Sequence, residues 1–258
     1  MIVCKIGGNV INNPATLHEA LDYVAGQAAP TILVHGGGRR ASEVLTEMGR
    51  TPRMVDGRRI TDQPTLEIVT MVYAGLINKD IVAQLQARGS NAIGLSGADG
   101  NAVVATKRPV RTVDYGFAGD VTAVNAPLLD GLLRLGLRPV LCPITHDLHA
   151  QLLNTNADTI ANETARALAA IGHEVTLQYC FELPGVLRDI DDPDSVIPSL
   201  TPETYAALRA DGKISAGMIP KLDNAFGAVA AGVREVVIGN IEALSTGGGT
   251  RVHAGPTS

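Results

Sequence analysis

Short apolar runs alternate with amphipathic stretches along most of the chain, and this alternation predicts a parallel α/β arrangement. β-Branched and other apolar residues form runs of strand length, and the stretches between them carry apolar residues at helical spacing. Buried strands are expected at 1–6, 31–35, 92–95, 138–142, 174–181 and 234–238. Helices are expected at 14–27, 40–48, 65–88, 126–135, 159–171, 201–211 and 220–231, with a break near Gly75. Strands and helices that take turns in this way are typical of a parallel sheet with helices packed on it.

Four segments depart from the alternation. Residues 54–61 predict a hairpin around Asp56-Gly57, and 103–106 with 110–120 predict a second hairpin over the sheet edge. Residues 143–153 are expected to form a polar connection, and 246–252 a loop with a short strand. The content of the chain changes after the helix of 159–171, so we expect a boundary between two lobes near residue 172.

Composition narrows the class of protein. Hydrophobic residues make up 45% of the 258 residues and charged ones 18%, which is ordinary for a soluble globular protein. The net charge of −5 and the 3% aromatic content argue against a nucleic-acid partner. The cysteines Cys4, Cys142 and Cys180 stand far apart in apolar runs and are expected to be reduced core residues. With no signal-peptide or membrane-spanning pattern, we expect a cytoplasmic enzyme.

The clearest candidate for an anion site is the glycine turn after 31–35. His35-Gly36-Gly37-Gly38 leads at once into the helical pattern of 40–48. A strand that passes through glycines into a helix presents backbone N–H groups to a phosphate or carboxylate. Glycine permits the close approach of a ligand and positive φ angles. Taken alone, the turn is equally consistent with a tight connection between a strand and a helix.

Two lysines and one aspartate stand at the ends of expected elements. Lys5 closes the first strand, Lys221 lies just inside the helix of 220–231, and Asp158 precedes the helix of 159–171. Phosphoryl transfer requires positive charge on the transferring group and in-line positioning. Two lysines oriented by one aspartate would supply both. The alternative is that both lysines are solvated strand and helix ends, which is common for lysine.

Other polar residues have two interpretations each. Arg59, after the first hairpin turn, could pair with a substrate carboxylate or lie on the surface beside Arg58. Asn154 and Asn156 could contact a ligand or cap the helix that follows. His146 and His149 lack an evident third metal ligand, so no metal site is assigned to the protein.

Several familiar sites are excluded by their motifs. Gly247-Gly248-Gly249-Thr250 lacks the lysine and the spacing of a P-loop, and no glycine turn has the dinucleotide-binding pattern. The His35 motif coincides with an oxyanion-hole motif of α/β-hydrolases, which also need Gly-x-Ser-x-Gly. The nearest match, residues 94–98, ends in Ala98. A hydrolase remains an alternative of a different class.

A set of short stretches, taken in order, resembles the N-acetylglutamate kinases of the amino acid kinase (carbamate kinase-like) superfamily. The stretches are Lys5-Ile6-Gly7-Gly8, His35-Gly36-Gly37-Gly38, Gly57-Arg58-Arg59-Ile60-Thr61, Asn78-Lys79, Gly116-Phe117-Ala118-Gly119-Asp120-Val121, Leu153-Asn154-Thr155-Asn156-Ala157-Asp158, Gly217-Met218-Ile219-Pro220-Lys221 and Gly248-Gly249-Thr250. Each is short, but their order and separations over almost the whole chain are specific. The resemblance implies a three-layer αβα sandwich with a mainly parallel central sheet and two lobes.

The resemblance also implies an activity, which is ATP-dependent phosphorylation of the γ-carboxylate of an N-acyl-L-glutamate on the arginine route. Lys5 and Lys221 would stabilise the transferring phosphoryl group, and Asp158 would hold both lysines. The roles implied for the substrate side are backbone N–H groups that hold oxygens, at Gly8, Gly37 and Gly38, and side chains that bind the acylated amino acid, Arg59 and Asn154. The positions implied for the nucleotide are Glu182, Leu183, Gly185, Leu187, Lys213 and Ser215.

The same resemblance divides the chain and implies partners. Residues 1–172 would bind the acylglutamate and dimerise, and residues 173–258 would bind ATP, with Mg²⁺ held mainly by the phosphates. Because the chain begins directly with its first strand, an arginine-insensitive homodimer is expected.

Departures from the family pattern leave alternatives open. Where the family has Ser/Thr-Asp-Val, this chain has Phe181-Glu182-Leu183 after Cys180, a variant similar to a branch in which some members use succinyl in place of acetyl. Other amino acid kinases, acting on carbamate, aspartate, glutamate or a carrier-linked substrate, share the phosphoryl machinery. A non-catalytic small-molecule sensor is disfavoured because Lys5, Asp158 and Lys221 are all present.

Overall fold

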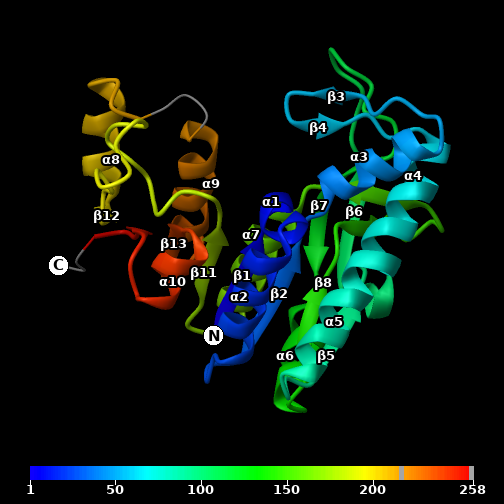
Figure 1. Ribbon diagram of the computed structural model, residues 1–258, viewed down its shortest axis with the longest axis horizontal. Coiled ribbons are helices and arrows are strands. Elements are labelled where there is room, and N and C mark those ends of the chain that lie inside the picture. The colour runs from blue at the N-terminus through cyan, green and yellow to red at the C-terminus, as the bar shows by residue number, and fades with distance from the viewer. Residues whose placement is uncertain (215–217, 256–258) are drawn as a thin grey trace.

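The computed structural model describes residues 1–214 and 218–255, and its centre is an eight-stranded sheet (Figure 1). The strand order is β12-β14-β13-β11-β1-β2-β8-β5. Neighbouring strands are parallel except β13 and β14, which are antiparallel. The strands are β1 (Ile2–Ile6), β2 (Thr31–His35), β5 (Ala92–Leu95), β8 (Arg138–Leu141), β11 (Thr176–Cys180), β12 (Ser199–Leu200), β13 (Glu235–Gly239) and β14 (Thr250–Val252). The predicted α/β class with a mainly parallel sheet is confirmed.

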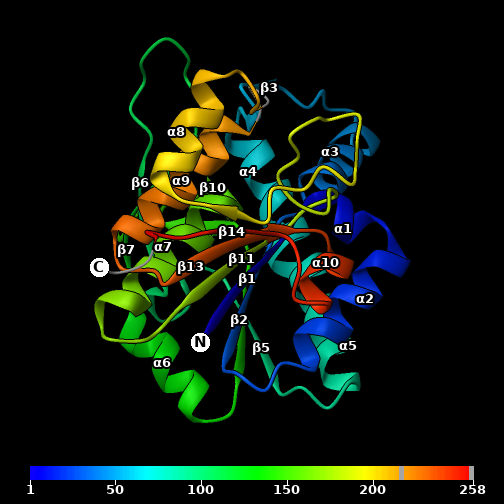
Figure 2. The same cartoon turned by 90° about the vertical axis from the view of Figure 1, so that its left-hand side faces the viewer.

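Helices cover both faces of the sheet and complete three layers (Figure 2). On one face lie α6 (Ala126–Arg134), α7 (Ala157–Ala170) and α9 (Ile219–Ala230), with α8 (Pro202–Ala210) beside them. On the other face lie α1 (Gly8–Asn12), α2 (Pro14–Ala25), α5 (Asn78–Ala87) and α10 (Ile241–Ser245). Each face has its own buried apolar cluster. The central strands are apolar on both sides because helices cover both, as parallel sheets require.

A helical segment and a small hairpin lie above the end of β2. Residue Gly38 begins α3 (Gly38–Glu47), and the hairpin pairs β3 (Met54–Val55) with β4 (Arg58–Arg59), as predicted. The predicted long helix consists of α4 (Gln63–Thr70), a π-helical stretch η1 (Met71–Ile77) and α5. The expected break near Gly75 is therefore a change from α-helix to π-helix, and the three helical segments follow one another without an intervening loop.

Four short strands form a second, separate unit. They are β6 (Val103–Lys107), β7 (Ala118–Val124), β9 (Ile144–His146) and β10 (Leu152–Thr155), which pair in a closed order; a 3₁₀ turn, η2 (Asp99–Asn101), precedes them. Two predictions were wrong here. The second strand of the hairpin is residues 118–124 rather than 110–120, and residues 143–153, expected to be a connection, contain β9 and the first half of β10. Short strands without alternation give little signal in a sequence.

Smaller differences complete the description of the fold. Gly8, expected in a turn, begins α1, and neither β12 nor α10 was predicted. Residue 172, near which the boundary between two lobes was predicted, lies between α7 and β11. Strand β11 pairs with β1 in the same sheet. The three cysteines are buried and free, as expected. Within the described ranges, the helices are too short or too polar to cross a membrane.

Candidate functional site

Two glycine turns meet at the ends of β1 and β2. These parallel strands pair so that Ile6 stands beside His35, and the Gly36 N–H donates to the Ile6 carbonyl at 3.1 Å. Gly8 begins α1 and Gly38 begins α3. A Cβ placed on Gly8 would lie 4.0 Å from the Gly38 nitrogen, so the two turns face each other. The starts of two helices therefore lie beside one small space, and backbone N–H groups at such positions can hold an anion.

Gly37 has no room for a side chain. Its φ is +144°, and a Cβ would lie 2.4 Å from Ile77 Cδ1 and 3.1 Å from Tyr73 Cδ1. Both of these side chains come from η1, so the π-helical stretch packs directly under the turn. The close approach requires glycine at this position, and π-helical turns are common at functional sites.

Lys5 of β1 and Asp158 of α7 form a close ion pair. The Lys5 ammonium lies 2.7 Å from Asp158 Oδ1, and Lys5 is only 7% exposed. Asp158 stands in the first turn of α7, whose cap is Asn156, with a side-chain oxygen that accepts from the Asp158 and Thr159 N–H groups. Of the two interpretations of Asn156, a ligand contact or a helix cap, the structure shows the cap. A buried ammonium of this kind needs a nearby carboxylate.

Lys221 faces the same centre from α9. Its ammonium lies 3.9 Å from the centre of the Phe181 ring, and the Lys5 ammonium lies 5.2 Å from the same ring. Burial lowers the pKa of Lys221, and Asp158 opposes this shift through its negative charge. Asp158 thus contacts Lys5 directly and acts on Lys221 through space. The two lysines predicted to work together are brought together, on one aromatic ring.

These residues line a cleft of about 580 Å³, which we call the lysine cleft. Its lining includes Lys5, Gly8, Gly38, Asp158, Phe181, Glu182, Leu183, Gly185, Met218 and Lys221. Of the predicted nucleotide positions, Leu187 is buried beside Val196 and Lys213 is exposed near Asp211, and neither is among the residues that line this cleft. Ser215 lies outside the described residues, as does Gly217.

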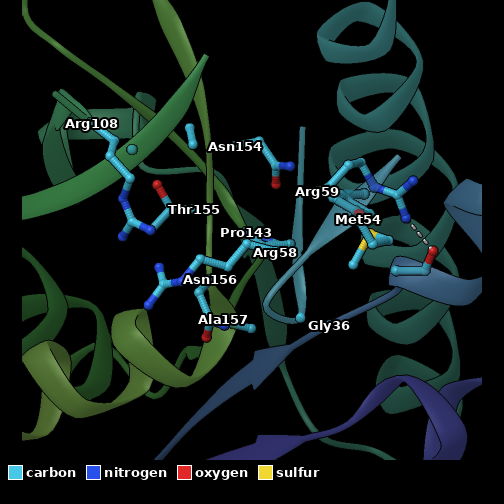
Figure 3. Close-up of a pocket in the computed structure, with 15 residues that line it drawn as sticks. Gly36, Met54, Arg58, Arg59, Arg108, Pro143, Asn154, Thr155, Asn156 and Ala157 are labelled. Carbon is cyan, nitrogen blue, oxygen red and sulfur yellow. Dashed lines mark hydrogen bonds between the residues drawn. The ribbon is translucent and has the colours of Figure 1, made fainter. Parts of the chain in front are cut away.

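A second cavity of about 180 Å³ adjoins the cleft, and we call it the arginine cavity (Figure 3). The two spaces share Gly38, Met54 and Arg59. The other polar residues that line the cavity are Arg58, Arg108, Asn154, Thr155 and Asn156. Gly36 and Gly38 are at its wall, and Gly37 is not among the lining residues.

Arg59 is held firmly in this wall. It is 6% exposed, and its Nη2 donates to the Gly38 carbonyl at 2.7 Å and to Ser42 Oγ at 2.8 Å. Its Nη1 is buried and donates to no acceptor within the described ranges. Buried guanidinium nitrogens are normally satisfied. The free donor at a cavity wall therefore favours an anionic ligand over the surface interpretation of Arg59.

Asn154 lies across the cavity from Arg59. Its Nδ2 donates to Thr61 Oγ1 at 3.0 Å, and its backbone N–H donates to the Phe117 carbonyl at 2.8 Å. In Figure 3 the side chains of Arg58 and Arg108 extend toward one another from opposite walls. Arg108 is paired with Asp120, and Asn154 is fixed by both bonds. The cavity is thus a polar, positively charged space bounded by ordered side chains.

Sequence reasoning missed two contributors to the site. Phe181 appeared only as part of a departure from the family pattern, and its contact with both lysines depends on how β11 meets α9. Arg108 directly follows β6, and no local signal in the sequence points to it. The hydrolase alternative gains no support. Ser96 Oγ donates to Asp99 Oδ2 at 2.8 Å, and within the described residues no histidine forms a hydrogen bond with this hydroxyl.

Comparison with known proteins identifies the class. The model of the amino acid kinase family matches residues 1–240. The chain therefore belongs to the amino acid kinase family, and membership in a family of kinases implies ATP as the phosphoryl donor. The fold predicted from the resemblance is confirmed.

Within that family, the chain is similar to several acetylglutamate kinases. The chain is 54% identical over 252 residues to the acetylglutamate kinase of Bacteroides thetaiotaomicron, covering 98% of each chain. It is 53% identical over 252 residues to that of Bacteroides fragilis, covering 98% of this chain and 96% of the relative. It is 44% identical to that of Methanopyrus kandleri, covering 98% and 100%.

Solved structures support the fold. N-acetylglutamate synthase from Neisseria gonorrhoeae, complexed with coenzyme A and N-acetyl-glutamate, superposes with a TM-score of 0.82 at 20% identity. That match covers 99% of this chain and 60% of the synthase chain. Carbamate kinase from Giardia lamblia bound to AMP-PNP superposes with a TM-score of 0.65 at 15% identity, covering 98% and 97%. At these identities the likeness concerns the fold alone.

Proposed function

We propose that this protein is an acetylglutamate kinase, which phosphorylates the γ-carboxylate of N-acetyl-L-glutamate with ATP on the arginine biosynthesis route. One observation carries the proposal. In a chain 53–54% identical to acetylglutamate kinases, the ammonium groups of Lys5 and Lys221 both lie over the Phe181 ring in the lysine cleft. This cleft shares part of its wall, including Arg59, with the arginine cavity. An acid substrate in the cavity and a nucleotide in the cleft would meet at these lysines.

The arginine cavity is the proposed site for the amino acid, within residues 1–172. The free Nη1 of Arg59 would donate to the α-carboxylate while Nη2 keeps its bonds to Gly38 and Ser42. Asn154, held by Thr61, would bind the acylated amino group. A guanidinium that is already ordered loses little freedom on binding a carboxylate, so the cavity is preorganised for an acid.

The transfer would take place between Gly8 and Gly38. An oxygen of the γ-carboxylate attacks the γ-phosphorus of ATP, the bond from that phosphorus to the bridging oxygen breaks, and ADP leaves. Backbone N–H groups of Gly8, Gly37 and Gly38 would hold the oxygens, and the two lysines would balance the negative charge spread over the phosphoryl group. Asp158 would position Lys5 directly and keep Lys221 protonated.

The nucleotide is assigned to the side of the lysine cleft that residues 173–258 form. Glu182, Leu183 and Gly185 line the cleft and would contact ATP there. Leu187, Lys213 and Ser215 remain predicted nucleotide positions. In the described part of the chain no three His, Cys, Asp or Glu side chains gather to hold a metal ion. Mg²⁺ would therefore arrive with ATP, bound mainly by phosphate oxygens, and would neutralise part of their charge.

A second candidate substrate, N-succinyl-L-glutamate, is favoured by a separate observation. Arg58 and Arg108 line the arginine cavity in addition to Arg59, and they extend toward each other (Figure 3). Guanidinium groups that face one another across a cavity favour an anion between them. A succinyl group would carry a carboxylate to that position, whereas an acetyl group would not.

An assay of ADP release tests both candidates. The protein is supplied with ATP and Mg²⁺ and with N-acetylglutamate, N-succinylglutamate, glutamate, aspartate or carbamate in turn. Turnover with N-acetylglutamate is the expected result, and the ratio of kcat/KM for the two acylglutamates decides the acyl group. Turnover with neither acylglutamate, with activity on one of the other acids, would assign the protein to a different branch of the family.

We also propose a cytoplasmic homodimer. Met71 and Leu76 of η1 are 56% and 54% exposed, an apolar surface that a second copy would cover. Light scattering coupled to gel filtration measures the mass directly. A mass of about twice the 26.9 kDa chain is expected, and a monomer at all concentrations would contradict the assignment.

A further inference from the structure

His35 is a fully buried histidine directly beneath the glycine turn. Its exposed fraction is 0%, and its Nδ1 lies 2.7 Å from the Gly36 carbonyl oxygen. A carbonyl oxygen only accepts, so Nδ1 must carry the proton of this bond. Burial lowers the pKa of His35 to about 4, so the ring is neutral at physiological pH. With one proton on the ring, Nε2 is an acceptor.

Asn78 supplies the donor that Nε2 requires. Its Nδ2 lies 3.2 Å from His35 Nε2 and 2.9 Å from the Val140 carbonyl, which uses both hydrogens of the amide. Its Oδ1 accepts from Lys79 Nζ at 3.1 Å, and Lys79 also donates to the Gly94 carbonyl at 3.1 Å. Every bond therefore has a fixed direction, from Lys79 through Asn78 and His35 to the Gly36 carbonyl.

Two further features fit this chain of bonds. A Cβ on Gly94 would lie 1.9 Å from Asn78 Oδ1 and 2.7 Å from Lys79 Nζ, so β5 approaches both side chains in a way that only glycine allows. Asn78 is also the first residue of α5, directly after η1. The segment that packs Tyr73 and Ile77 under Gly37 thus also delivers the amide that holds His35.

The geometry points to a positioning role: we infer that Lys79, Asn78 and His35 form a directed hydrogen-bond relay that sets the Gly36–Gly37 peptide for substrate binding. A trans peptide is planar, and its carbonyl and N–H point in opposite directions. By holding the Gly36 oxygen, His35 fixes the direction of the Gly37 N–H, which bonds to no acceptor in the described chain. The inference rests on the proposed function, in which this N–H holds a substrate oxygen.

The sharpest test exchanges one atom of the relay. Asn78→Asp replaces the donating NH₂ by an oxygen, so His35 Nε2 faces an acceptor. The imidazole can then satisfy both neighbours only as the doubly protonated cation. When it loses a proton, the ring donates from Nε2 to the new carboxylate, and an Nδ1 lone pair faces the Gly36 oxygen. The repulsion turns the peptide, so activity should depend on His35 protonation.

Few other groups near His35 and Asn78 change their charge in the pH range of this experiment. Lys79 is the charged side chain that acts on the imidazole, and it is unchanged in the variant. Ile6 of β1 stands beside His35 in the sheet, and Cys142 follows β8 on the other side. Burial raises the pKa of Cys142 to about 12, so this thiol does not titrate in the range of the experiment.

Two measurements are expected to change together. In NMR of ¹³C-labelled histidine rings, with the His35 signal assigned by its loss in His35→Asn, the His35 titration should move upward from about pH 4. The kcat of Asn78→Asp should fall by about 10-fold as pH rises through the new titration, with the KM for ATP little changed. This is part of the roughly 10²–10³-fold that complete removal of such a donor costs, because the Gly37 N–H is turned and not lost. The wild-type protein should show no such decline there.

The matched control is Gln178→Glu, which places a carboxylate at another buried amide. Gln178 lies on β11, is 8% exposed, and accepts a hydrogen bond from the Tyr23 hydroxyl at 3.0 Å. The Gln178→Glu variant should leave the histidine titrations and the pH profile unchanged. A second pair separates donation from packing: His35→Asn keeps a donor for the Gly36 carbonyl, and His35→Leu does not. The leucine variant should lose about 10-fold or more in kcat, and the asparagine variant a few-fold.

Contradictory outcomes are distinct from failure of the proposed function. If His35 in Asn78→Asp keeps its wild-type titration, the relay is wrong, whatever the substrate of the enzyme. If folded His35→Leu and His35→Asn have equal kcat values, donation to Gly36 has no role. If the wild-type protein turns over neither acylglutamate while the NMR shift appears, the relay stands as a structural device and the proposed function fails.

Discussion

The arginine cavity and the lysine cleft share a wall but are held together by different forces. In the cavity, Arg59 has two hydrogen bonds of 2.7 and 2.8 Å, and Asn154 is fixed by Thr61. In the cleft, Lys5 is paired with Asp158, but Lys221 is half-buried and rests on the face of Phe181, 3.9 Å from its centre. Directional bonds therefore set the cavity, whereas a contact with little directional preference places Lys221.

This difference suits the two ligands. A carboxylic acid must present one oxygen in line with the phosphorus, and directional bonds preset before binding favour such alignment. An ammonium over an aromatic ring keeps its attraction while it shifts across the face. Lys221 can therefore follow the phosphoryl group as charge moves from ATP to the acid. The comparison predicts that changes in the cavity act on KM for the acid, whereas changes in the cleft act on kcat.

The largest effect is expected from the charged centre of the cleft. Lys221→Ala and Asp158→Ala should each lower kcat by about 10²-fold or more, because both act on charge that develops in the transition state. Steady-state kinetics with thermal melts checks this. The control is Asp223→Ala. Asp223 lies on α9, as Lys221 does, and pairs with Arg209 of α8, so this variant should stay near wild type. Near-normal kcat in both cleft variants would mean that the lysines and Asp158 have a structural role alone.

The next effect tests the cavity. Arg59→Lys should raise the KM for the acylglutamate by about 10-fold or more, because an ammonium cannot bond the Gly38 carbonyl, Ser42 and a carboxylate with the geometry of a guanidinium. The KM for ATP should change little. Arg53→Lys, on the exposed segment before the hairpin, provides the same chemical change outside the cavity. An equal rise in both KM values would remove the distinction between the two regions.

A smaller effect is expected at the aromatic platform. Phe181→Leu should lower kcat roughly 5-fold, since a cation–π contact of about 1 kcal/mol is lost from Lys221. Phe181→Tyr keeps the ring face and should retain most activity. Phe226→Leu removes a ring that stacks on Tyr205 at 5.0 Å, away from the cleft, as a control. If tyrosine and leucine at position 181 behave alike, the ring acts by bulk alone.

Local signals explain which parts of the structure were predictable. Asn13 followed by Pro14 is a typical start of a helix, and in the structure the Asn13 side chain accepts from the Ala15 and Thr16 N–H groups at the start of α2. The π-helical form of η1 was not predictable, because it depends on the packing of Tyr73 and Ile77 against Gly37, which lies far away in the sequence.

The site shows the same limit. The sequence marks Lys5, Asp158 and Lys221 as unusual polar residues at element ends, but their meeting depends on the order of β1, β11 and the helices α7 and α9. Without the resemblance, these lysines would have remained indistinguishable from surface residues. Phe181 is an apolar residue after an apolar strand, and nothing near it in sequence predicts a contact with two cations.

The smallest expected effect concerns the pH profile of the cleft. Burial lowers the pKa of Lys221, while Asp158 and, more weakly, Glu182 raise it. The active form carries the ammonium, so kcat should decline as pH rises through this lowered pKa. Glu182→Gln removes one of the two groups that favour the ammonium, so the Lys221 pKa should fall further and the decline should begin at lower pH.

Because Glu182 also lines the cleft, the test compares the pH at which kcat declines and not the height of the plateau. Glu67→Gln, on α4 and away from the cleft, is the matched control for the lost charge and should not move the profile. An unchanged alkaline decline in Glu182→Gln would mean that a group other than Lys221, beyond the reach of the Glu182 charge, governs it. The contrast between a cleft that acts through the Lys221 ammonium and the arginine cavity would then lose its support.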